Sequence, residues 1–203
     1  MAWKRFQGNK VVTSVPCKPQ ASESQLLEKD YEELGWLGPI GKRLNMLSNG
    51  WALSYANTFP FTEKHPFGFA FLATNIIYAV VGYAMFVHGN TGKSLILDAA
   101  GVASIAYHWR QIHLGPNRNE VRYALMIDYF TAVMAIGSVI FDICSGAVSG
   151  NLSLKALCLG VVAFLNLFGS WYYANGMPYL FFHGLWHVFS GWCAAEVTGI
   201  SVF

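Results

Sequence analysis

Three histidines, an aspartate and a serine lie inside apolar stretches of this chain, where ionisable side chains are costly and usually functional. They are Ser104, His108, Asp128, His183 and His187. Ser104 precedes His108 by four residues, and His183 stands in the same relation to His187. Residues four apart share a helix face. Two imidazoles on one face and a third from a facing helix can ligate one zinc ion and leave its fourth position open, as in catalytic zinc sites.

A zinc ion in such a site lowers the pKa of a water molecule to about 7 and makes hydroxide available at neutral pH. Asp128 could orient or deprotonate that water, and Ser104 could donate a hydrogen bond to the water or to a developing oxyanion. The segment from His183 to His187 lacks the glutamate of the HExxH motif, which argues against a zincin protease. The predicted catalytic residues are therefore Asp128 and Ser104, and the predicted metal ligands are the three histidines.

Five apolar runs could place these residues, and each is long enough to cross about 30 Å of hydrocarbon. The runs cover residues 67–87, 94–112, 121–144, 152–173 and 179–202. Their connections are short and rich in Gly, Asn and Pro, which favours antiparallel neighbours in a bundle. The sequence therefore predicts an all-α integral membrane protein of about five transmembrane helices over residues 65–203. Residues 1–64 form a polar N-terminal segment in which 35–60 are predicted to be interfacial.

The depth of the polar residues in these runs indicates that they meet. Ser104 and His108 lie near the inner end of the second run, and Asp128 lies near the start of the third. His183 and His187 lie in the first turns of the fifth run. At about 1.5 Å rise per residue, all five side chains lie roughly 5 to 14 Å from the inner end. Three helices thus present them to one layer of the bundle.

Composition agrees with a membrane location. The chain has 203 residues, 54% hydrophobic and 12% charged, whereas soluble domains carry about 25% charged residues. A net charge of +2 gives nucleic-acid binding no support, and no two of the four cysteines have CxxC spacing. Lys and Arg gather on the side of the N-terminus, which predicts that this terminus lies inside, in the cytoplasm. We expect an endomembrane location, with an organelle membrane as the alternative because the first 22 residues are basic and lack acids.

At these residues the sequence resembles a superfamily of membrane hydrolases that contains the alkaline ceramidases and the progestin and adiponectin receptors. The shared pattern is Ser-x-x-x-His late in one helix, an Asp in the next and His-x-x-x-His in the last. Here it reads Ser104 to His108, Asp128, and His183-Gly-Leu-Trp-His187, and the likeness covers residues 67–203. The family has seven helices, so this chain would be a reduced version that lacks two between Asp128 and His183.

The resemblance implies a zinc ion held by His108, His183 and His187, with Asp128 and Ser104 around its bound water. It implies hydrolysis of an amide or ester bond in a membrane lipid, with a sphingolipid such as ceramide as the substrate. Ceramidases also carry an acidic calcium-binding stretch before the first helix. Acidic residues lie in that region here, at Asp30, Glu32 and Glu33, but their pattern does not match, so calcium is a weaker candidate than zinc.

Two other functions remain open from the sequence. The chain could be a non-catalytic membrane subunit or receptor that keeps a structural metal site and binds a membrane protein partner through residues 1–64. Alternatively, histidines inside a membrane can be axial ligands of haem or chlorophyll, which would make the protein a pigment or haem carrier. Bound zinc without lipid hydrolysis would favour the first alternative, and a coloured protein would favour the second.

Overall fold

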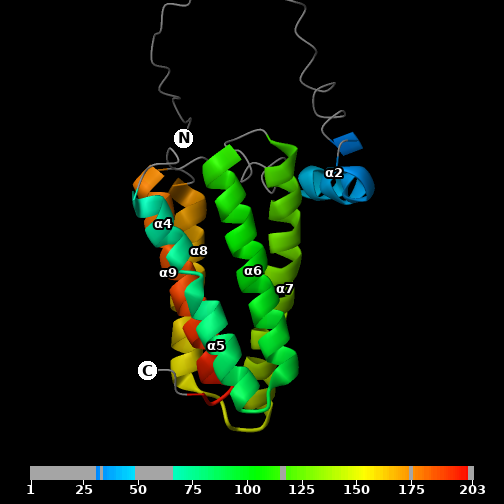
Figure 1. Cartoon of the computed structure of the whole chain (residues 1–203). Coiled ribbons are helices and arrows are strands. Elements are labelled where there is room, and N and C mark those ends of the chain that lie inside the picture. The colour runs from blue at the N-terminus through cyan, green and yellow to red at the C-terminus, as the bar shows by residue number, and fades with distance from the viewer. Residues whose placement is uncertain (1–30, 33, 49–65, 115–117, 174–175, 201–203) are drawn as a thin grey trace, which may run out of the picture.

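The fold is known from a computed structural model that describes residues 31–32, 34–48, 66–114, 118–173 and 176–200. Within these ranges the regular structure is helical throughout, as predicted. A 3-10 turn, η1, leads into a short helix, and five long helical columns follow (Figure 1). The elements are η1 (Gly35–Leu37), α2 (Gly38–Leu47), α4 (Pro66–Ala73), α5 (Ile76–Val87), α6 (Thr91–Leu114), α7 (Asn119–Val148), α8 (Leu154–Tyr173) and α9 (Gly176–Val197).

The first column differs from the expected single span over residues 67–87. It consists of two helices, α4 and α5, that are separated by Thr74 and Asn75. The Thr74 hydroxyl donates a hydrogen bond of 2.6 Å to the carbonyl oxygen of Phe71, one turn earlier. A threonine hydroxyl bonded to the preceding turn is a known cause of helix bending. The break therefore places Thr74 at a corner of the column.

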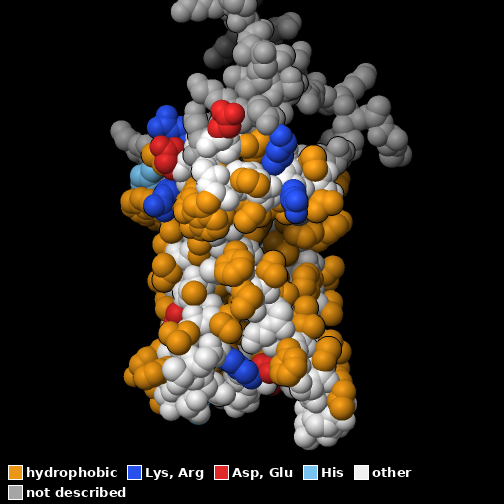
Figure 2. Space-filling view, turned by 90° about the vertical axis from the view of Figure 1, so that its right-hand side faces the viewer, with side chains coloured by type: hydrophobic (Ala, Val, Ile, Leu, Met, Phe, Trp, Pro, Cys, Tyr) orange, Lys and Arg blue, Asp and Glu red, His pale blue; other side chains and the backbone are white. Residues whose placement is uncertain are grey.

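Three stretches of the described chain are long and apolar enough to cross a membrane. They are Phe67–Val87, which combines α4 and α5, Asn119–Val148 and Leu154–Tyr173. Hydrophobic side chains cover most of the middle of the surface in Figure 2. These features indicate a membrane protein. Helices α6 and α9 are of similar length, but they carry more polar side chains, including Lys93, Asp98 and Arg110 on α6.

The five columns pack as a curved row. Helix α7 packs on α6, α6 on α5, α5 on α9, and α9 on α8. Helix α4, which precedes α5 in the same column, contacts both α6 and α9. Helix α7 also reaches α9, but α7 and α8 barely touch, although only a short turn joins them in sequence. The row therefore curls around a space, with α7 and α8 at its two ends.

Two hydrophobic clusters fill the bundle, one toward each end. The first joins Leu34 and Leu37, from the segment before α2, to Phe71, Val121 and Tyr179. The second joins residues of α5, α6 and the end of α9, among them Tyr78, Leu97 and Ala194. Because the polar residues predicted to meet lie between Phe71 and Tyr78 in depth, they occupy the layer between the two clusters.

Helix α2 lies across the end of the bundle beside α7, nearly at right angles to the long columns (Figure 1). Ile40, Met46 and Leu47 are exposed on it together with Lys42 and Arg43. Exposed apolar and basic side chains on one short helix are typical of a segment that lies in a membrane interface. Residues 49–60, the remainder of the predicted interfacial segment, lie outside the described residues.

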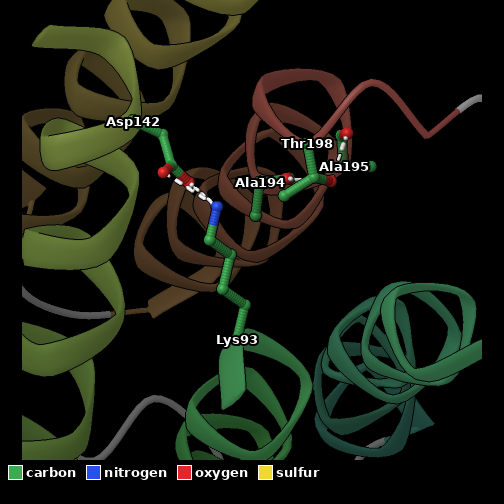
Figure 3. A network of polar contacts seen from close by, with 5 residues as sticks. All are labelled: Lys93, Asp142, Ala194, Ala195 and Thr198. Atoms are coloured by element: carbon green, nitrogen blue, oxygen red, sulfur yellow. Dashed lines mark hydrogen bonds and ion pairs between the residues drawn. The ribbon is translucent and has the colours of Figure 1, made fainter. Parts of the chain in front are cut away.

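Charged side chains mark the two ends of the bundle (Figure 2). At the opposite end from α2, Lys93 of α6 reaches Asp142 of α7, with 2.8 Å between Nζ and each carboxylate oxygen (Figure 3). At that end too, Lys155 of α8 lies 2.7 Å from Glu196 of α9. These ion pairs each tie two neighbouring helices together. Asp142 and Glu196 therefore act in helix packing at the end of the bundle opposite α2.

Candidate metal centre

Three histidines predicted as metal ligands from sequence come together in the structure. One nitrogen of each of His108, His183 and His187 lies within 4.8 Å of the corresponding nitrogens of the other two. Their ring centroids are 5.0 Å apart for His108 and His183, and 4.9 Å apart for His183 and His187. The third pair, His108 and His187, is separated by 5.5 Å. One ion could therefore be held by all three side chains.

The three rings are buried, and aromatic side chains hold them in place. His108 has no exposed surface, and His183 and His187 have very little. The ring of Phe71 packs against all three imidazoles, at 4.6 Å from His108, 5.8 Å from His183 and 5.6 Å from His187. Tyr179 stacks on His183 with 5.1 Å between ring centroids. This packing restricts the orientation of each imidazole before any ligand binds.

The Nδ1 atom of His187 has a partner that fixes its proton. It lies 2.8 Å from the hydroxyl oxygen of Thr74. That hydroxyl already donates its one hydrogen to the carbonyl oxygen of Phe71, so toward His187 it can only accept. With the hydroxyl hydrogen in that bond, His187 carries its proton on Nδ1 and keeps a lone pair on Nε2.

The Nδ1 atoms of His183 and His108 also lie beside oxygen atoms that act as hydrogen-bond acceptors. The Nδ1 atom of His183 lies 3.2 Å from the hydroxyl of Ser170, and that hydroxyl donates its hydrogen to the carbonyl of Leu167 at 2.7 Å. The Nδ1 atom of His108 lies 2.9 Å from the amide oxygen of Gln111, which is only an acceptor. Both histidines thus donate from Nδ1 and keep the Nε2 lone pair.

The Nε2 atoms of His108 and His187 lack a close hydrogen-bond donor among the described residues. The Nε2 atom of His108 is buried and has no hydrogen-bond partner among the described residues. The Nε2 atom of His187 has only the Ser104 hydroxyl, at a long 3.4 Å. A buried acceptor without a partner costs about 1–3 kcal/mol. A cation bound by the three nitrogens would remove that cost, so the residues present fit a metal ion of the zinc type.

The supporting partners match a common pattern of metal sites, in which each ligating histidine donates its second N–H to a protein oxygen. Here those oxygens belong to Thr74, Gln111 and Ser170, which sequence analysis did not single out. Gln111 could have been found, because it stands three residues after His108 and shares its helix face. Thr74 and Ser170 come from other columns, and neither has a spacing that relates it to a histidine.

The predicted catalytic residues face the same space as two of the histidines. Ser104, Asp128, His183 and His187 all line one cavity of about 470 Å³. Asp128 is not one of the side chains of the three-histidine group. His108 lies behind the cavity wall. The catalytic roles of Ser104 and Asp128 stay predictions.

Apart from these groups, a serine (Ser190) and several tyrosines, the lining of the cavity is apolar. Helices α6, α7, α8 and α9 supply its walls, with side chains such as Leu97, Ile136, Phe164 and Cys193. Its size falls within the roughly 300–1,000 Å³ of small-molecule sites. A few convergent polar groups at one level of an apolar cavity are the usual arrangement of a binding or active site.

The weaker calcium site was predicted in the acidic region before the first column. Of the three acidic residues in that region, Asp30 and Glu33 lie outside the described residues. Glu32 is described and exposed. Calcium binding by this region therefore stays a prediction.

The chain was compared with protein-family models, curated proteins and solved structures, and none of the three comparisons gives a match.

Proposed function

We propose that this chain is a zinc-dependent membrane hydrolase that cleaves an amide or ester bond in a membrane lipid, similar to the alkaline ceramidases. One observation carries the proposal. Three buried histidines, each with Nδ1 within hydrogen-bond distance of a protein oxygen, bring one ring nitrogen each within 4.8 Å of one another, and two of them line a largely apolar cavity. The helices that build this cavity include two that are long and apolar enough to cross a membrane.

Zinc is the metal that these ligands favour. Neutral imidazoles are borderline ligands that suit zinc, whereas calcium and magnesium require oxygen ligands. His108, His183 and His187 would hold the ion. When bound, zinc supplies a water molecule of lowered pKa and polarises a carbonyl oxygen.

The remaining chemistry belongs to the chain itself. Asp128 lines the cavity, and its carboxylate can take a proton from water and return it to the leaving amine or alcohol. Ser104, which faces the same cavity, can donate a hydrogen bond to an oxygen that gains negative charge. The apolar walls accommodate the acyl chain of a lipid and keep bulk water from the reacting groups.

The proposed protein spans the membrane with all five columns. Helices α6 and α9 carry more polar side chains than the other columns, and those of the site, Ser104, His108, His183 and His187, are buried inside the bundle. Arg110, Arg118 and Arg122 lie at the end of the bundle near α2, whereas both lysines at the other end are paired with acids. By the positive-inside rule the α2 end faces the cytoplasm, and an endomembrane is the proposed location.

Lipid hydrolysis by the purified protein tests this function. The protein is reconstituted in phosphatidylcholine vesicles with ceramides or with ester-linked lipids, and released fatty acid is measured by mass spectrometry. Release should stop when a chelator removes the metal and return when zinc is added. A folded, colourless, zinc-loaded protein that releases no fatty acid from any of these lipids would contradict the proposal and favour a non-catalytic subunit.

A further inference from the structure

The cavity beside the histidines is open on one side. Helices α7 and α8, the two ends of the curved row, barely touch each other, yet both contribute to the cavity wall. Three of the lining side chains are also strongly exposed on the outer surface. Val133 and Ile140 of α7 are 66% and 48% exposed, and Phe164 of α8 is 50% exposed. Exposed lining side chains on both α7 and α8, together with the sparse contacts between these two helices, place the opening of the cavity between them.

The opening faces the region where hydrocarbon would surround the protein. The flanking helices, Asn119–Val148 and Leu154–Tyr173, are two of the three stretches that are long and apolar enough to cross a membrane. The side chains at the opening are apolar, and no charged residue of the described chain lines the cavity apart from Asp128 and the histidines. Lipid chains, and not water, would therefore meet this opening.

We propose that one acyl chain of a membrane lipid enters sideways between α7 and α8 and lies along the cavity, parallel to the helices. This inference rests on the proposed function, because it names the path by which the substrate reaches that site. The cavity is long enough for an acyl chain. Its lining on α7 extends from Leu125 to Ile143, which corresponds to about 27 Å at 1.5 Å per residue.

The arrangement of polar groups sets the direction of the bound lipid. On α6 and α7, Ser104 and Asp128 lie within about one turn of the inner end of the lining, and His183 begins the lining on α9. The outer part of the cavity is bounded by Leu97, Ile143 and other apolar side chains. The methyl end of the acyl chain therefore points to the outer end of the cavity. The bond that joins the acyl chain to the polar head of the lipid lies beside the histidines. The substrate class is a lipid with a long N-acyl or O-acyl chain.

Photochemical cross-linking tests this path without requiring catalysis. The full-length protein is placed in phosphatidylcholine nanodiscs that contain a small share of a lipid whose acyl chain bears a diazirine near its end. After illumination, adducts are mapped by mass spectrometry. Helix α9 is the informative target, because no residue from Phe182 to Thr198 is exposed while Cys193 and Ala194 line the cavity. We expect adducts around these two residues, because a lipid outside the bundle cannot reach them.

A matched pair of variants on α7 shows whether the lipid enters the cavity. Ile136→Trp places a large side chain in the cavity, since Ile136 lines it. Met134→Trp places the same side chain two residues away, where Met134 is exposed and does not line the cavity. We expect Ile136→Trp to reduce the α9 adducts at least fivefold and Met134→Trp to leave them unchanged. Zinc content and thermal midpoint report that each variant is folded.

Two results would overturn the proposed path. The first is that α9 of the folded wild type carries no more adduct in the illuminated sample than in a sample kept without illumination. The second is a stable dimer in which cross-links join α7 or α8 of two copies, because a second copy would then close the opening. Adducts on α9 in a protein that hydrolyses no lipid would keep this path and reject the proposed function, so the two failures are distinguishable.

Discussion

The Nδ1 atom of His187 lies 2.8 Å from the hydroxyl of Thr74, a residue 113 positions earlier that stands at the break between α4 and α5. One threonine thus does two things. Its hydrogen goes to the carbonyl of Phe71 and shapes the break, and its oxygen accepts from the imidazole and sets the tautomer of His187. The helix break and the metal site are parts of the same local structure.

Thr74→Val should weaken zinc binding without removing it. The variant keeps the shape of the side chain but loses the acceptor for His187, and loss of such an outer partner typically costs 10- to 100-fold in metal affinity. Thr74→Ser, which restores a hydroxyl, should recover most of the loss. Competition with a chelator of known affinity measures both effects.

The control for this experiment is Thr131→Val. The Thr131 hydroxyl donates only to carbonyl oxygens of its own helix, at Ile127 and Asp128. Its loss should leave the zinc affinity unchanged. If Thr74→Val binds zinc as tightly as Thr131→Val, the bond to Thr74 has no part in holding His187.

Asp128→Asn should abolish lipid hydrolysis while zinc stays bound. The amide cannot accept the proton that a carboxylate accepts, and general base catalysis contributes about 10²–10⁴-fold to rates. Asp128 is not one of the converging ligands, so the metal content should equal that of the wild type. Asp142→Asn, on the same helix but outside the cavity, is the control and should keep most of the activity. Equal activity of the two variants would remove Asp128 from the mechanism.

The sequence was sufficient to predict the helices and the meeting of three histidines, for a simple reason. Membrane-length apolar runs and short turns leave few arrangements open, and the rise of a helix then sets the depth of each polar side chain. His108, His183 and His187 could be brought together on that basis alone. The all-α fold is confirmed.

Other features could not be predicted because they depend on contacts between columns. The break at Thr74 arises from a hydroxyl that serves both the helix and His187, and nothing in an apolar run marks that residue. Ser170 meets His183 only because α8 packs closely on α9. The opening between α7 and α8 follows from which helices pack together. The depth of a residue along its helix does not determine which helices pack against each other.

Removing the charge of Lys93 should destabilise the bundle. Its partner Asp142 has a side chain that is only 13% exposed, so Lys93→Met would leave a largely buried carboxylate without its ion pair. We expect a loss of about 1–3 kcal/mol and a fall of several degrees in the thermal midpoint. The double variant Lys93→Met/Asp142→Leu should recover much of the loss, because neither charge then remains.

Lys155→Met is the comparison for that pair. Lys155 is 58% exposed in its pair with Glu196, and exposed ion pairs contribute only about 0–1 kcal/mol. The thermal midpoint of Lys155→Met should therefore fall less than the thermal midpoint of Lys93→Met. A larger effect of Lys155→Met would contradict this interpretation of the two pairs.

Two glycine variants should have opposite effects on stability. A Cβ atom on Gly191 of α9 would lie 2.8 Å from Cγ1 of Ile77 on α5, so Gly191→Ala must push the two helices apart at a cost of about 1–3 kcal/mol. A Cβ atom on Gly137 of α7 would have no atom within 4 Å. Gly137→Ala should therefore gain up to about 1 kcal/mol from helix propensity. Thermal unfolding in detergent, followed by circular dichroism, measures both, and a stable Gly191→Ala protein would contradict the close approach of α5 and α9.

Elemental analysis of the detergent-purified protein tests the metal centre most directly. The wild type is compared with His183→Ala/His187→Ala and with His88→Ala/His113→Ala, whose histidines lie outside the cluster and bond to carbonyl oxygens one turn earlier in the chain. We predict about one zinc per chain in the wild type and in the control, and none in the His183→Ala/His187→Ala variant. A folded wild type without metal, or a double variant that keeps its zinc, would contradict the account.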